Sequence, residues 1–439
     1  MTYDEAALYL TGTINETLSR RSPNRLDRMA GFLRRLGDPH RAYPTIHVGG
    51  TSGKGSTSTM IAAALTASGK RVGLHTKPHL SSMTERARID GLPIAADRFG
   101  ELLAEMMPAI EATTAEFGRP SYYETLLALA FAHFARERVD AAVIEVGIGG
   151  KLDGTNLVLP EVSVITNVGL DHTEILGETT DLIAADKAGI AKAGVPLVSD
   201  ARDNSRSIIE AACAAVGAPF FAVKEHAALR ARPSEPYGQS FEIATGAGTY
   251  EIALPILGRF QQRNAATAVV ALERLRPELR PAIADVERGF SQLMIPGRME
   301  YFPGFPGIIF DVAHNADKAR SLAEALAETF PQRRFAFVVG IGATKDAQAV
   351  LQPLFDLPAT FVFTAFETAG RKSERPSRLA NIAERAGVGA RVIGDPIEAL
   401  GVARRNADAS HVVVVTGSTF VTGLLRDWWL EHVGERSRR

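Results

Sequence analysis

The segment TIHVGGTSGKGSTSTM, residues 45–60, has the residue types and spacing of a site for phosphate chemistry. An apolar run typical of a strand enters a Gly-rich turn, and a helical pattern with hydroxyl residues in its first turn follows. Phosphate oxygens need converging backbone N–H donors, which glycines and a helix N-terminus supply. The segment therefore predicts a nucleotide-binding loop made of Gly50, Thr51, Ser52, Gly53, Lys54, Gly55, Ser56 and Thr57.

Two side-chain types define the expected chemistry of this loop. Lys54 would meet the β- and γ-phosphates, and Ser56 or Thr57 would offer a hydroxyl to Mg²⁺. The spacing departs from a strict Walker A motif, because Val48 stands where the first glycine would fall and Gly55 follows the lysine. A Gly-rich turn without a nucleotide is the plainer reading, but strand, loop, lysine, hydroxyls and helix all occur in order.

Three further residues lie after or between the predicted strands. Glu145 follows the apolar run AAVI, and an acid at the carboxyl end of such a strand projects into the ligand crevice of an α/β sheet. His172 follows the predicted strand at 162–169, where a lone histidine is more often a hydrogen-bonding loop residue. Lys187 lies in a helical pattern, where the default is a solvated side chain.

Short β-branched runs alternate with helical patterns along the chain, which predicts α/β layers built on parallel sheets. The segment from Phe221 to Leu257 differs, because polar and Pro/Gly-rich positions are followed there by the alternating stretch FEIATGAGTYEIAL, which predicts a small antiparallel hairpin. A helix is expected next, at about Asn264 to Arg274. The IPGR segment predicts a boundary between domains 1–296 and 297–439. Strands are expected at 45–50, 71–76, 141–147, 162–169 and 195–200, and then at 307–314, 334–342, 359–366, 390–395 and 411–418.

Length and composition indicate an ordinary globular protein. At 439 residues, two domains are expected. The net charge of −1 argues against a nucleic-acid binder that relies on broad positive charge. The N-terminus does not resemble a secretory signal, no apolar run is long enough to span a membrane, and Cys213 is the only cysteine. We therefore expect a cytoplasmic enzyme with neither a nucleic-acid nor a membrane partner.

Nine segments in order resemble one family, the folylpolyglutamate synthases/dihydrofolate synthases of the Mur ligase superfamily. They are HVGGTSGKGS, HTKPHLSSMTERARIDG, SYYETLLALAF, EVGIGGKLDGTN, VITNVGLDHTEILG, DKAGIAKAGVP, GRFQQRNAATA, IPGRME and DVAHNADKA. The resemblance implies an N-terminal P-loop-type parallel-sheet ATPase domain with a small β excursion, and a C-terminal Rossmann-like α/β domain. Members are often monomeric.

The resemblance also implies a reaction. ATP would convert a folate or dihydropteroate carboxylate to an acyl phosphate, which the amine of L-glutamate then attacks. Catalytic roles would fall to Lys54, Glu145, His172, Lys187 and His314. Glu145, His172 and Ser56 would bind Mg²⁺ at two sites, and Lys187 would be carbamylated by CO₂ to serve the second metal.

Residues of the second half would complete nucleotide binding. By resemblance, Asn264 is an adenine-side residue, Arg298 approaches the phosphates, Asp311 lies near the nucleotide and His314 lies near the amino acid. Two residues of that motif depart from the family pattern, Val312 and Ala316, and the stretch with Lys345 and Asp346 matches only loosely.

Lys77 departs more sharply, because the family commonly has a serine there that serves the first Mg²⁺. Glu145 and the loop hydroxyl could hold that metal alone, Lys77 could partly replace the metal, or Lys77 could contact an unusual substrate. Phe260 and Gly154 are smaller departures. A pterin-like ring would need an apolar pocket, for which we considered Phe117, Tyr122, Tyr123 and the segment His79–Met83.

Two other functions are compatible with parts of this pattern. One is a Mur-type ligase acting on a different carboxylate, disfavoured because only about 45 residues precede the loop. The other is a P-loop ATPase without ligase activity. The sequence does not determine whether the first glutamate, later glutamates or both would be added.

Overall fold

The computed structural model describes the chain except residues 15–23, 233–237, 369–370 and 435–439. The chain forms two compact units. Unit 1 comprises Met1–Ser234, Ser240–Leu254 and Gln261–Leu293, and unit 2 comprises Glu235–Gln239, Pro255–Phe260 and Met294–Arg439. The expected division into domains 1–296 and 297–439 stays a prediction.

Unit 1 is built on an eight-stranded sheet of order β4-β3-β2-β5-β1-β6-β7-β8. Neighbours from β2 to β8 pair in parallel, and β3 and β4 add an antiparallel edge. Val48 of β1 lies beside Glu145 of β5 and Val164 of β6, so the loops after these strands meet at one edge. The strands are β1 (Thr45–Gly49), β2 (Val72–His75), β3 (Arg88–Ile89), β4 (Leu92–Pro93), β5 (Ala141–Glu145), β6 (Val162–Ile165), β7 (Leu197–Ser199) and β8 (Phe220–Ala222).

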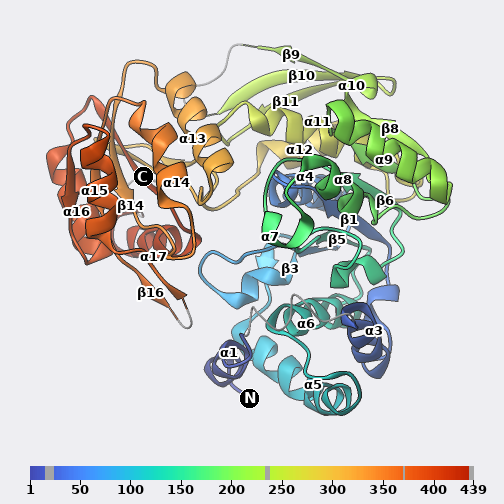
Figure 1. Ribbon diagram of the computed structural model, residues 1–439. Helices are drawn as coiled ribbons and strands as arrows, with labels where there is room; N and C mark the ends of the chain where they lie inside the picture. The colour runs from blue at the N-terminus through green and yellow to red at the C-terminus, as the bar shows by residue number, and fades with distance from the viewer. Residues whose placement is uncertain (15–23, 233–237, 369–370, 435–439) are drawn as a thin grey trace. The chain divides into compact units, whose positions relative to one another are not determined.

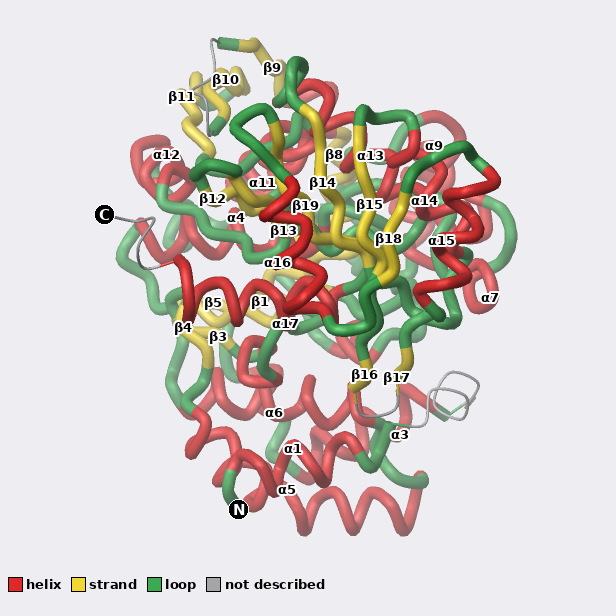
Figure 2. The backbone as a smooth tube through the Cα atoms, turned by 90° about the vertical axis from the view of Figure 1, so that its left-hand side faces the viewer, coloured by secondary structure: helices red, strands yellow, loops and turns green. Residues whose placement is uncertain are grey.

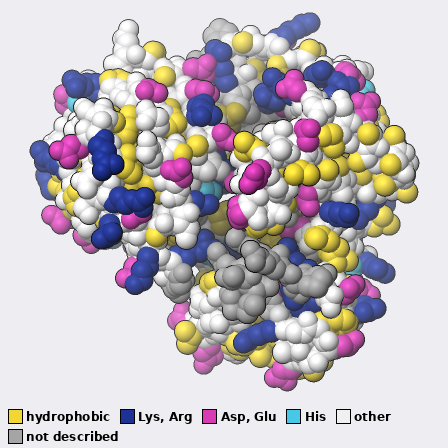
Figure 3. All heavy atoms as spheres, in the orientation of Figure 1, with side chains coloured by type: hydrophobic (Ala, Val, Ile, Leu, Met, Phe, Trp, Pro, Cys, Tyr) yellow, Lys and Arg dark blue, Asp and Glu magenta, His cyan; other side chains and the backbone are white. Residues whose placement is uncertain are grey.

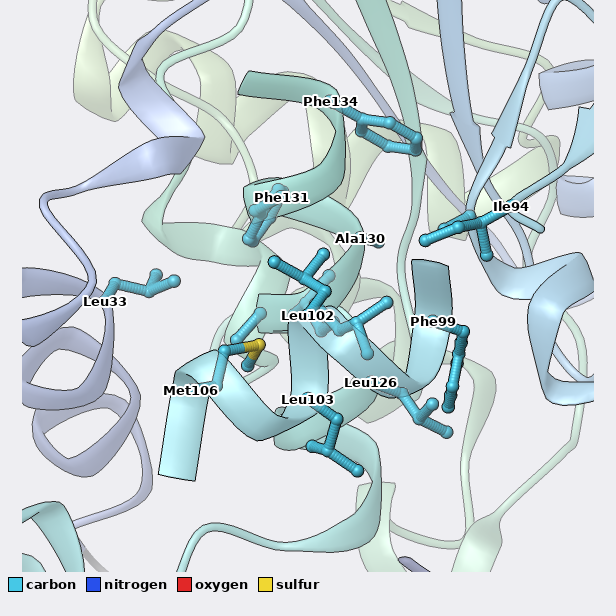
Figure 4. Packing of buried hydrophobic residues seen from close by; sticks show 14 of the residues in the cluster. Leu33, Ile94, Phe99, Leu102, Leu103, Met106, Leu126, Ala130, Phe131 and Phe134 are labelled. Atoms are coloured by element: carbon cyan, nitrogen blue, oxygen red, sulfur yellow. The ribbon is translucent and has the colours of Figure 1, made fainter. Parts of the chain in front are cut away.

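Four of the helices of unit 1 bury one shared core. Figure 1 shows α1, α3, α5 and α6 grouped together, and Figure 4 shows Leu33 of α3, Phe99 of α5 and Phe131 of α6 packed in that core. The helices are α1 (Tyr3–Thr11), α3 (Arg25–Arg35), α4 (Lys54–Ala67), α5 (Ala96–Phe117), α6 (Tyr122–Arg136), α7 (Thr173–Leu176), α8 (Thr180–Ala188), α9 (Asp203–Val216), α10 (Val223–His226), α11 (Phe260–Glu273) and α12 (Ile283–Ser291), with short 3₁₀ turns η1 (Pro39–Arg41), η2 (Met83–Arg86) and η3 (Gly154–Leu157).

The antiparallel excursion has one strand more than the sequence predicts. It is a three-stranded sheet of β9 (Ala227–Ala231), β10 (Gln239–Thr245) and β11 (Thr249–Leu254) in the order β11-β10-β9. Buried and exposed residues alternate along β11, as expected where one face is covered. The hairpin predicted in the alternating part, residues 241–254, is formed by β10 and β11, whereas β9 was not predicted. The start of the wider segment was placed too early, because Phe221 lies in β8 of the main sheet.

Unit 2 holds a six-stranded sheet of order β12-β13-β19-β14-β15-β18, in which only β12 is antiparallel to its neighbour. Figure 2 shows these strands side by side. Separate apolar clusters cover the two faces, which explains the almost continuous apolar runs such as VVVV in β19. The α/β fold class is confirmed, and the short edge strand β12 was not predicted.

The elements of unit 2 follow the expected alternation. The strands are β12 (Glu300–Phe302), β13 (Gly307–Phe310), β14 (Arg334–Val339), β15 (Ala359–Phe363), β16 (Glu367–Thr368), β17 (Arg371–Lys372), β18 (Ala390–Val392) and β19 (His411–Thr416). The helices are α13 (Ala316–Thr329), α14 (Ala347–Phe355), α15 (Pro376–Arg385), α16 (Pro396–Asn406) and α17 (Thr419–Trp429), with a terminal π-turn η4 (Leu430–Gly434).

Surface charge is mixed in sign. On the face in Figure 3, Lys and Arg side chains are interspersed with Asp and Glu, in keeping with the net charge of −1. Among the described residues, no helix combines the length and apolar character needed to cross a bilayer.

Candidate functional site

The loop between β1 and α4 requires glycine at two positions. Gly50 has φ +136° and Gly53, the N-cap of α4, has φ +80°. A Cβ on Gly50 would lie 1.9 Å from Oγ1 of Thr166, and one on Gly53 would lie 2.3 Å from Oδ1 of Asn264. Both the left-handed backbone and the close neighbours therefore exclude a side chain here.

Hydrogen bonds fix this loop to the segment that follows β6. The backbone N–H groups of Thr51 and Ser52 donate to Asn167, to its carbonyl at 3.0 Å and its Oδ1 at 2.8 Å. Thr166 Oγ1 donates to the carbonyl of Ser52 at 2.6 Å. The first-turn N–H groups of α4 lack intrahelical partners by helix geometry, so they remain as donors for an anion.

Sequence reasoning missed Thr166 and Asn167. The available signal was a pair of polar residues directly after an apolar run, but both were counted as part of the strand predicted at 162–169, whereas β6 ends at Ile165.

Lys54 and Lys187 meet at the same carbonyl. Nζ of Lys54 donates to Gly50 O at 2.9 Å and Thr51 O at 3.1 Å, and Nζ of Lys187 donates to Gly50 O at 2.9 Å. Lys187 is 4% exposed. Burial, followed by the charges of Lys54 and Lys77, lowers the pKa of Lys187 to about 7. Lys187 is thus a buried amine at the phosphate loop, whereas a solvated helix residue was its default.

Glu145 points toward the first turn of α4. A Cβ on Gly55 would lie 3.4 Å from Oε2 of Glu145, and the same oxygen accepts the backbone N–H of Lys77 at 3.0 Å. Glu145 is 3% exposed, and no hydrogen bond of its Oε1 is found within the described residues. The carboxylate of Glu145 therefore lies beside the phosphate loop, and its expected role at a ligand crevice stays a prediction.

Lys77 lies beside Glu145, to which its backbone N–H donates. Burial, then repulsion from Lys54, lowers the pKa of Lys77 to about 8, although the charge of Glu145 opposes the shift.

The expected metal ligands are only partly brought together. Ser56 is buried in the first turn of α4. His172 is instead partly exposed, precedes α7 as its N-cap with φ +53°, and has Nδ1 3.7 Å from a carboxylate oxygen of Glu174. No cluster of three or more His, Cys, Asp or Glu side chains suited to a metal occurs among the described residues. Asp171, next to His172, instead acts electrostatically on Lys187.

The residues present nevertheless fit Mg²⁺ beside a phosphate. Mg²⁺ is usually held by one or two carboxylates together with phosphate oxygens and water, so a ready cluster is not required. Glu145 supplies a carboxylate beside Gly55, and the next residue, Ser56, supplies a hydroxyl in the same turn of α4. The buried Oγ1 of Thr57 also has no hydrogen-bond partner within the described part of the chain.

Asp153 organises the loop after β5. Its carboxylate accepts hydrogen bonds from Tyr123 Oη at 3.0 Å, Thr155 N at 3.0 Å and Ile148 N at 3.1 Å. Burial opposes ionisation, but the charge of Arg25 and these hydrogen bonds hold the pKa of Asp153 below its usual value. Asp153 therefore positions the GIGG loop. Tyr123 packs against this loop at Gly147, where a Cβ would lie 2.7 Å from the tyrosine hydroxyl.

The aromatic residues considered for a pterin pocket do not form one group. The guanidinium of Arg86 lies 5.5 Å from the ring centroid of Tyr122 and donates to Nδ1 of His79 at 3.0 Å. Phe117 instead packs against α3, where its ring lies under Arg35 and against Gly31. Arg86 was not considered from the sequence, because a cation in this motif carries no distinctive spacing.

Asn264 lies against the phosphate loop in unit 1. It is 9% exposed, its Oδ1 faces Gly53, and its Nδ2 donates to Oε1 of Gln261 at 2.9 Å. Phe260, the first residue of α11, is exposed, with 36% of its surface accessible.

Unit 2 brings together Asp311, Arg298 and His314. The carboxylate of buried Asp311 accepts the N–H groups of Met299 at 2.9 Å and Ala313 at 2.8 Å. Burial raises the pKa of Asp311, and the charge of Arg298 partly offsets this. Burial beside Lys318 lowers the pKa of His314 to about 3, so its imidazole is neutral near pH 7.

The two loosely matched residues of unit 2 differ in position. Asp346 caps α14, because its Oδ1 accepts the N–H of Ala349 at 3.1 Å. Lys345 is exposed and acts on His314 electrostatically. Glu300 of β12 accepts two hydrogen bonds from Arg426, at 2.6 and 2.8 Å, and thereby holds the segment after Arg298.

Comparison with known proteins identifies the class. A model of the Mur ligase middle domain matches residues 48–272, and a model of the Mur ligase glutamate ligase domain matches residues 297–419. The chain therefore belongs to the Mur ligase superfamily, as the motifs predicted.

Individual relatives narrow the assignment. The dihydrofolate synthase/folylpolyglutamate synthase of Bacillus subtilis is 31% identical over 408 residues, 91% of this chain and 94% of that protein. A crystal structure of Mycobacterium tuberculosis folylpolyglutamate synthase complexed with ADP has a TM-score of 0.88 at 30% identity, covering 97% of this chain and 98% of that one. Within the superfamily, the chain is a member of the folylpolyglutamate synthase/dihydrofolate synthase family.

One relative is much longer. A probable bifunctional folylpolyglutamate synthase/dihydropteroate synthase of Haloferax volcanii is 34% identical over 416 residues. The match covers 93% of this chain but 49% of that protein, so the chain spans about half its length.

Proposed function

We propose that this protein is an ATP-dependent ligase that forms an amide between a folate or dihydropteroate carboxylate and the amine of L-glutamate. The observation that carries the proposal is the position of Glu145, whose carboxylate faces the first turn of α4 directly beside the phosphate loop. The related Mycobacterium tuberculosis enzyme, of similar fold, was crystallised with ADP, which supports a nucleotide in this loop.

The proposed ligase reaction has two steps. An oxygen of the acceptor carboxylate attacks the γ-phosphorus of ATP, the bond to the β–γ bridging oxygen breaks, and ADP leaves. The glutamate nitrogen then attacks the carbonyl carbon of the acyl phosphate, the bond from that carbon to the phosphate oxygen breaks, and phosphate and a proton leave. In both steps negative charge builds up around the transferred phosphoryl group, so the site must supply positive charge to neutralise it.

Residues of unit 1 fit this need. The N-terminus of α4 and the ammonium of Lys54 would hold the β- and γ-phosphates. Ser56, Glu145 and His172 would hold Mg²⁺ at two sites, and Mg²⁺ would supply positive charge at the phosphates. Asn264, against Gly53, would contact the adenine side.

Carbamylation of Lys187 is part of the proposal. Only a neutral amine reacts with CO₂, and the pKa of about 7 leaves much of Lys187 neutral near physiological pH. The product is an anionic oxygen ligand, which would serve the second Mg²⁺ site.

Residues of unit 2 would contribute further contacts to the nucleotide and to the amino acid. Arg298 would contact phosphate oxygens through its planar fork, and Asp311 would lie near the nucleotide. His314, neutral and 2.8 Å from the carbonyl of Val312 through Nδ1, would face the amino acid. The protein would act as a cytoplasmic monomer.

Phosphate release from ATP and Mg²⁺ tests the proposal, with L-glutamate and either dihydropteroate, tetrahydrofolate or no acceptor. Release that requires both glutamate and one pterin would support it and identify the step. Release that needs neither acid nor amine would instead show an ATPase without ligase activity. Release with a different carboxylate alone would show a Mur-type ligase for another acceptor.

A further inference from the structure

Lys77 is the charged residue near the phosphate loop for which the proposed reaction has no assigned task. It lies between β2 and η2, and its backbone N–H, not its ammonium, contacts Glu145. The side chain is half-buried, so solvent reaches it. Within the described part of the chain, no hydrogen bond or ion pair of its ammonium is found.

The charges around Lys77 do not neutralise it. Lys54 repels it most strongly, and Glu145 and Asp153 attract it less. Asp153 already accepts hydrogen bonds from Tyr123, Thr155 and Ile148, so it is committed elsewhere. A lysine that is part-buried beside another lysine is unfavourable in the free protein, because both charges lose hydration.

A polyanion would remove this cost. The loop that Lys54 belongs to is built for the β- and γ-phosphates, and Lys77 acts electrostatically on both Lys54 and Lys187. The carboxylate of Glu145 lies beside the first turn of α4 and accepts the backbone N–H of Lys77. The backbone of Lys77 therefore lies beside the phosphate loop. Because a lysine side chain is long and flexible, its ammonium can reach the end of the loop where the γ-phosphate would be expected.

We infer that Lys77 binds the γ-phosphate of ATP directly and supplies positive charge that a divalent metal would otherwise have to provide there. This inference rests on the proposed function, because it requires a nucleotide in the loop. Of the three possibilities that the sequence left open for Lys77, this inference selects partial replacement of the metal. Its consequence is nucleotide binding that depends unusually little on Mg²⁺.

Calorimetric titration with a non-hydrolysable ATP analogue, and separately with ADP, tests this inference. Wild-type protein and the Lys77→Ser and Lys77→Met variants are each titrated in excess EDTA and in saturating Mg²⁺. Lys77→Met keeps the length of the side chain and removes its charge. Lys224→Ser is the matched control, because Lys224 is an exposed lysine of α10 in the same unit.

In EDTA, both Lys77 variants are expected to bind the ATP analogue about tenfold more weakly than wild type, the loss typical of one charge-assisted hydrogen bond. Saturating Mg²⁺ should reduce that loss for Lys77→Ser, whose hydroxyl can join the metal shell. ADP affinity should change little in either variant, because ADP lacks the γ-phosphate. Lys224→Ser should resemble wild type throughout.

The same titrations can overturn the inference. If wild type binds the analogue and both Lys77 variants bind it equally well in EDTA, the inference is wrong and the proposed function stands. An equal loss for ADP and the ATP analogue also contradicts a γ-phosphate contact. If wild type binds neither nucleotide in either condition, the proposed function itself fails. Circular dichroism checks that each variant is folded.

Discussion

The ammonium groups of Lys54 and Lys187 donate hydrogen bonds to one acceptor, the backbone carbonyl oxygen of Gly50, each over 2.9 Å. Two cations on one carbonyl repel each other, and the more buried of them, Lys187, has the pKa lowered to about 7. The fold thus places a lysine that is readily neutral against the phosphate loop. That condition is the one that addition of CO₂ requires.

Carbamylation of Lys187 should be directly visible. With ¹³C-bicarbonate, a carbamate carbon signal is expected in wild type and not in Lys187→Arg. The signal should grow as pH rises through about 7, because the amine loses its proton in that range. Lys192→Arg is the control, since Lys192 is another part-buried lysine of unit 1, bonded to the carbonyl of Asn156. A signal that persists in Lys187→Arg, or full activity of Lys187→Ala, would contradict the prediction.

Much of this architecture follows from local sequence pattern. The loop 50–57, the strand ahead of Glu145 and the parallel strands of both units are encoded by short apolar runs and glycines, so they could be predicted. What could not be predicted depends on contacts between distant segments. Asn167 reaches Ser52, and Phe117 packs on α3 rather than near Tyr122. No local spacing signals either contact.

The third strand of the excursion, β9, was missed for a related reason. Its sequence AALRA does not alternate between apolar and polar residues, and four of its five residues are exposed. It forms because its backbone pairs with β10, from Ala231 opposite Phe241 to Ala227 opposite Thr245. Pairing of this kind is a tertiary effect that outweighs side-chain pattern.

Gly50→Ala should weaken nucleotide binding strongly. The new Cβ would overlap Oγ1 of Thr166, at 1.9 Å, in a backbone conformation that alanine disfavours. We expect at least a tenfold loss of ATP-analogue affinity and a destabilisation of about 1–3 kcal/mol. Calorimetry and urea unfolding measure the two effects.

Gly69→Ala is the control for Gly50→Ala, because it introduces backbone strain without a steric clash of the kind expected with Thr166. Gly69 also has positive φ, +85°, but a Cβ there would meet nothing within 4 Å. It should cost about 1–2 kcal/mol of stability and leave nucleotide affinity unchanged. Equal affinity losses in the two variants would show that the close approach of Thr166 is not what matters.

Arg28→Met should strongly destabilise unit 1. Arg28 and Glu124 form a buried bidentate pair, with Nε to Oε2 at 3.1 Å and Nη2 to Oε1 at 3.0 Å. Removing the arginine leaves a carboxylate buried without its partner, which costs about 3–5 kcal/mol. The measurement is the free energy of unfolding in urea.

An exposed pair provides the comparison. Arg71 and Glu137 form an ion pair whose side chains are 48% and 34% exposed. Arg71→Met should cost less than about 1 kcal/mol, because water solvates both charges when the pair is broken. Similar costs for Arg28→Met and Arg71→Met would show that burial does not control the strength of these pairs.

The stability of unit 1 should fall in mild acid because of His47. The imidazole is fully buried, its Nε2 lies 2.8 Å from Oγ1 of Thr155, and burial lowers its pKa to about 4. The unfolded chain, with the ordinary pKa of 6.5, therefore binds the proton more readily than the folded chain. The contribution is complete above pH 6.5 and is lost as the pH falls from 6.5 toward 4.

Thermal unfolding of wild type and His47→Gln, measured between about pH 4.5 and pH 7.5, tests this assignment. Gln cannot be protonated but can still hydrogen bond to Thr155, so the variant's melting temperature should decline less steeply with acid. Its melting temperature at neutral pH is not the readout, because a change of packing would shift it independently of protonation. His75, equally buried and with its pKa also lowered to about 4, remains in the variant, so part of the slope should persist. Identical slopes in the two proteins would mean that protonation of His47 does not drive the loss.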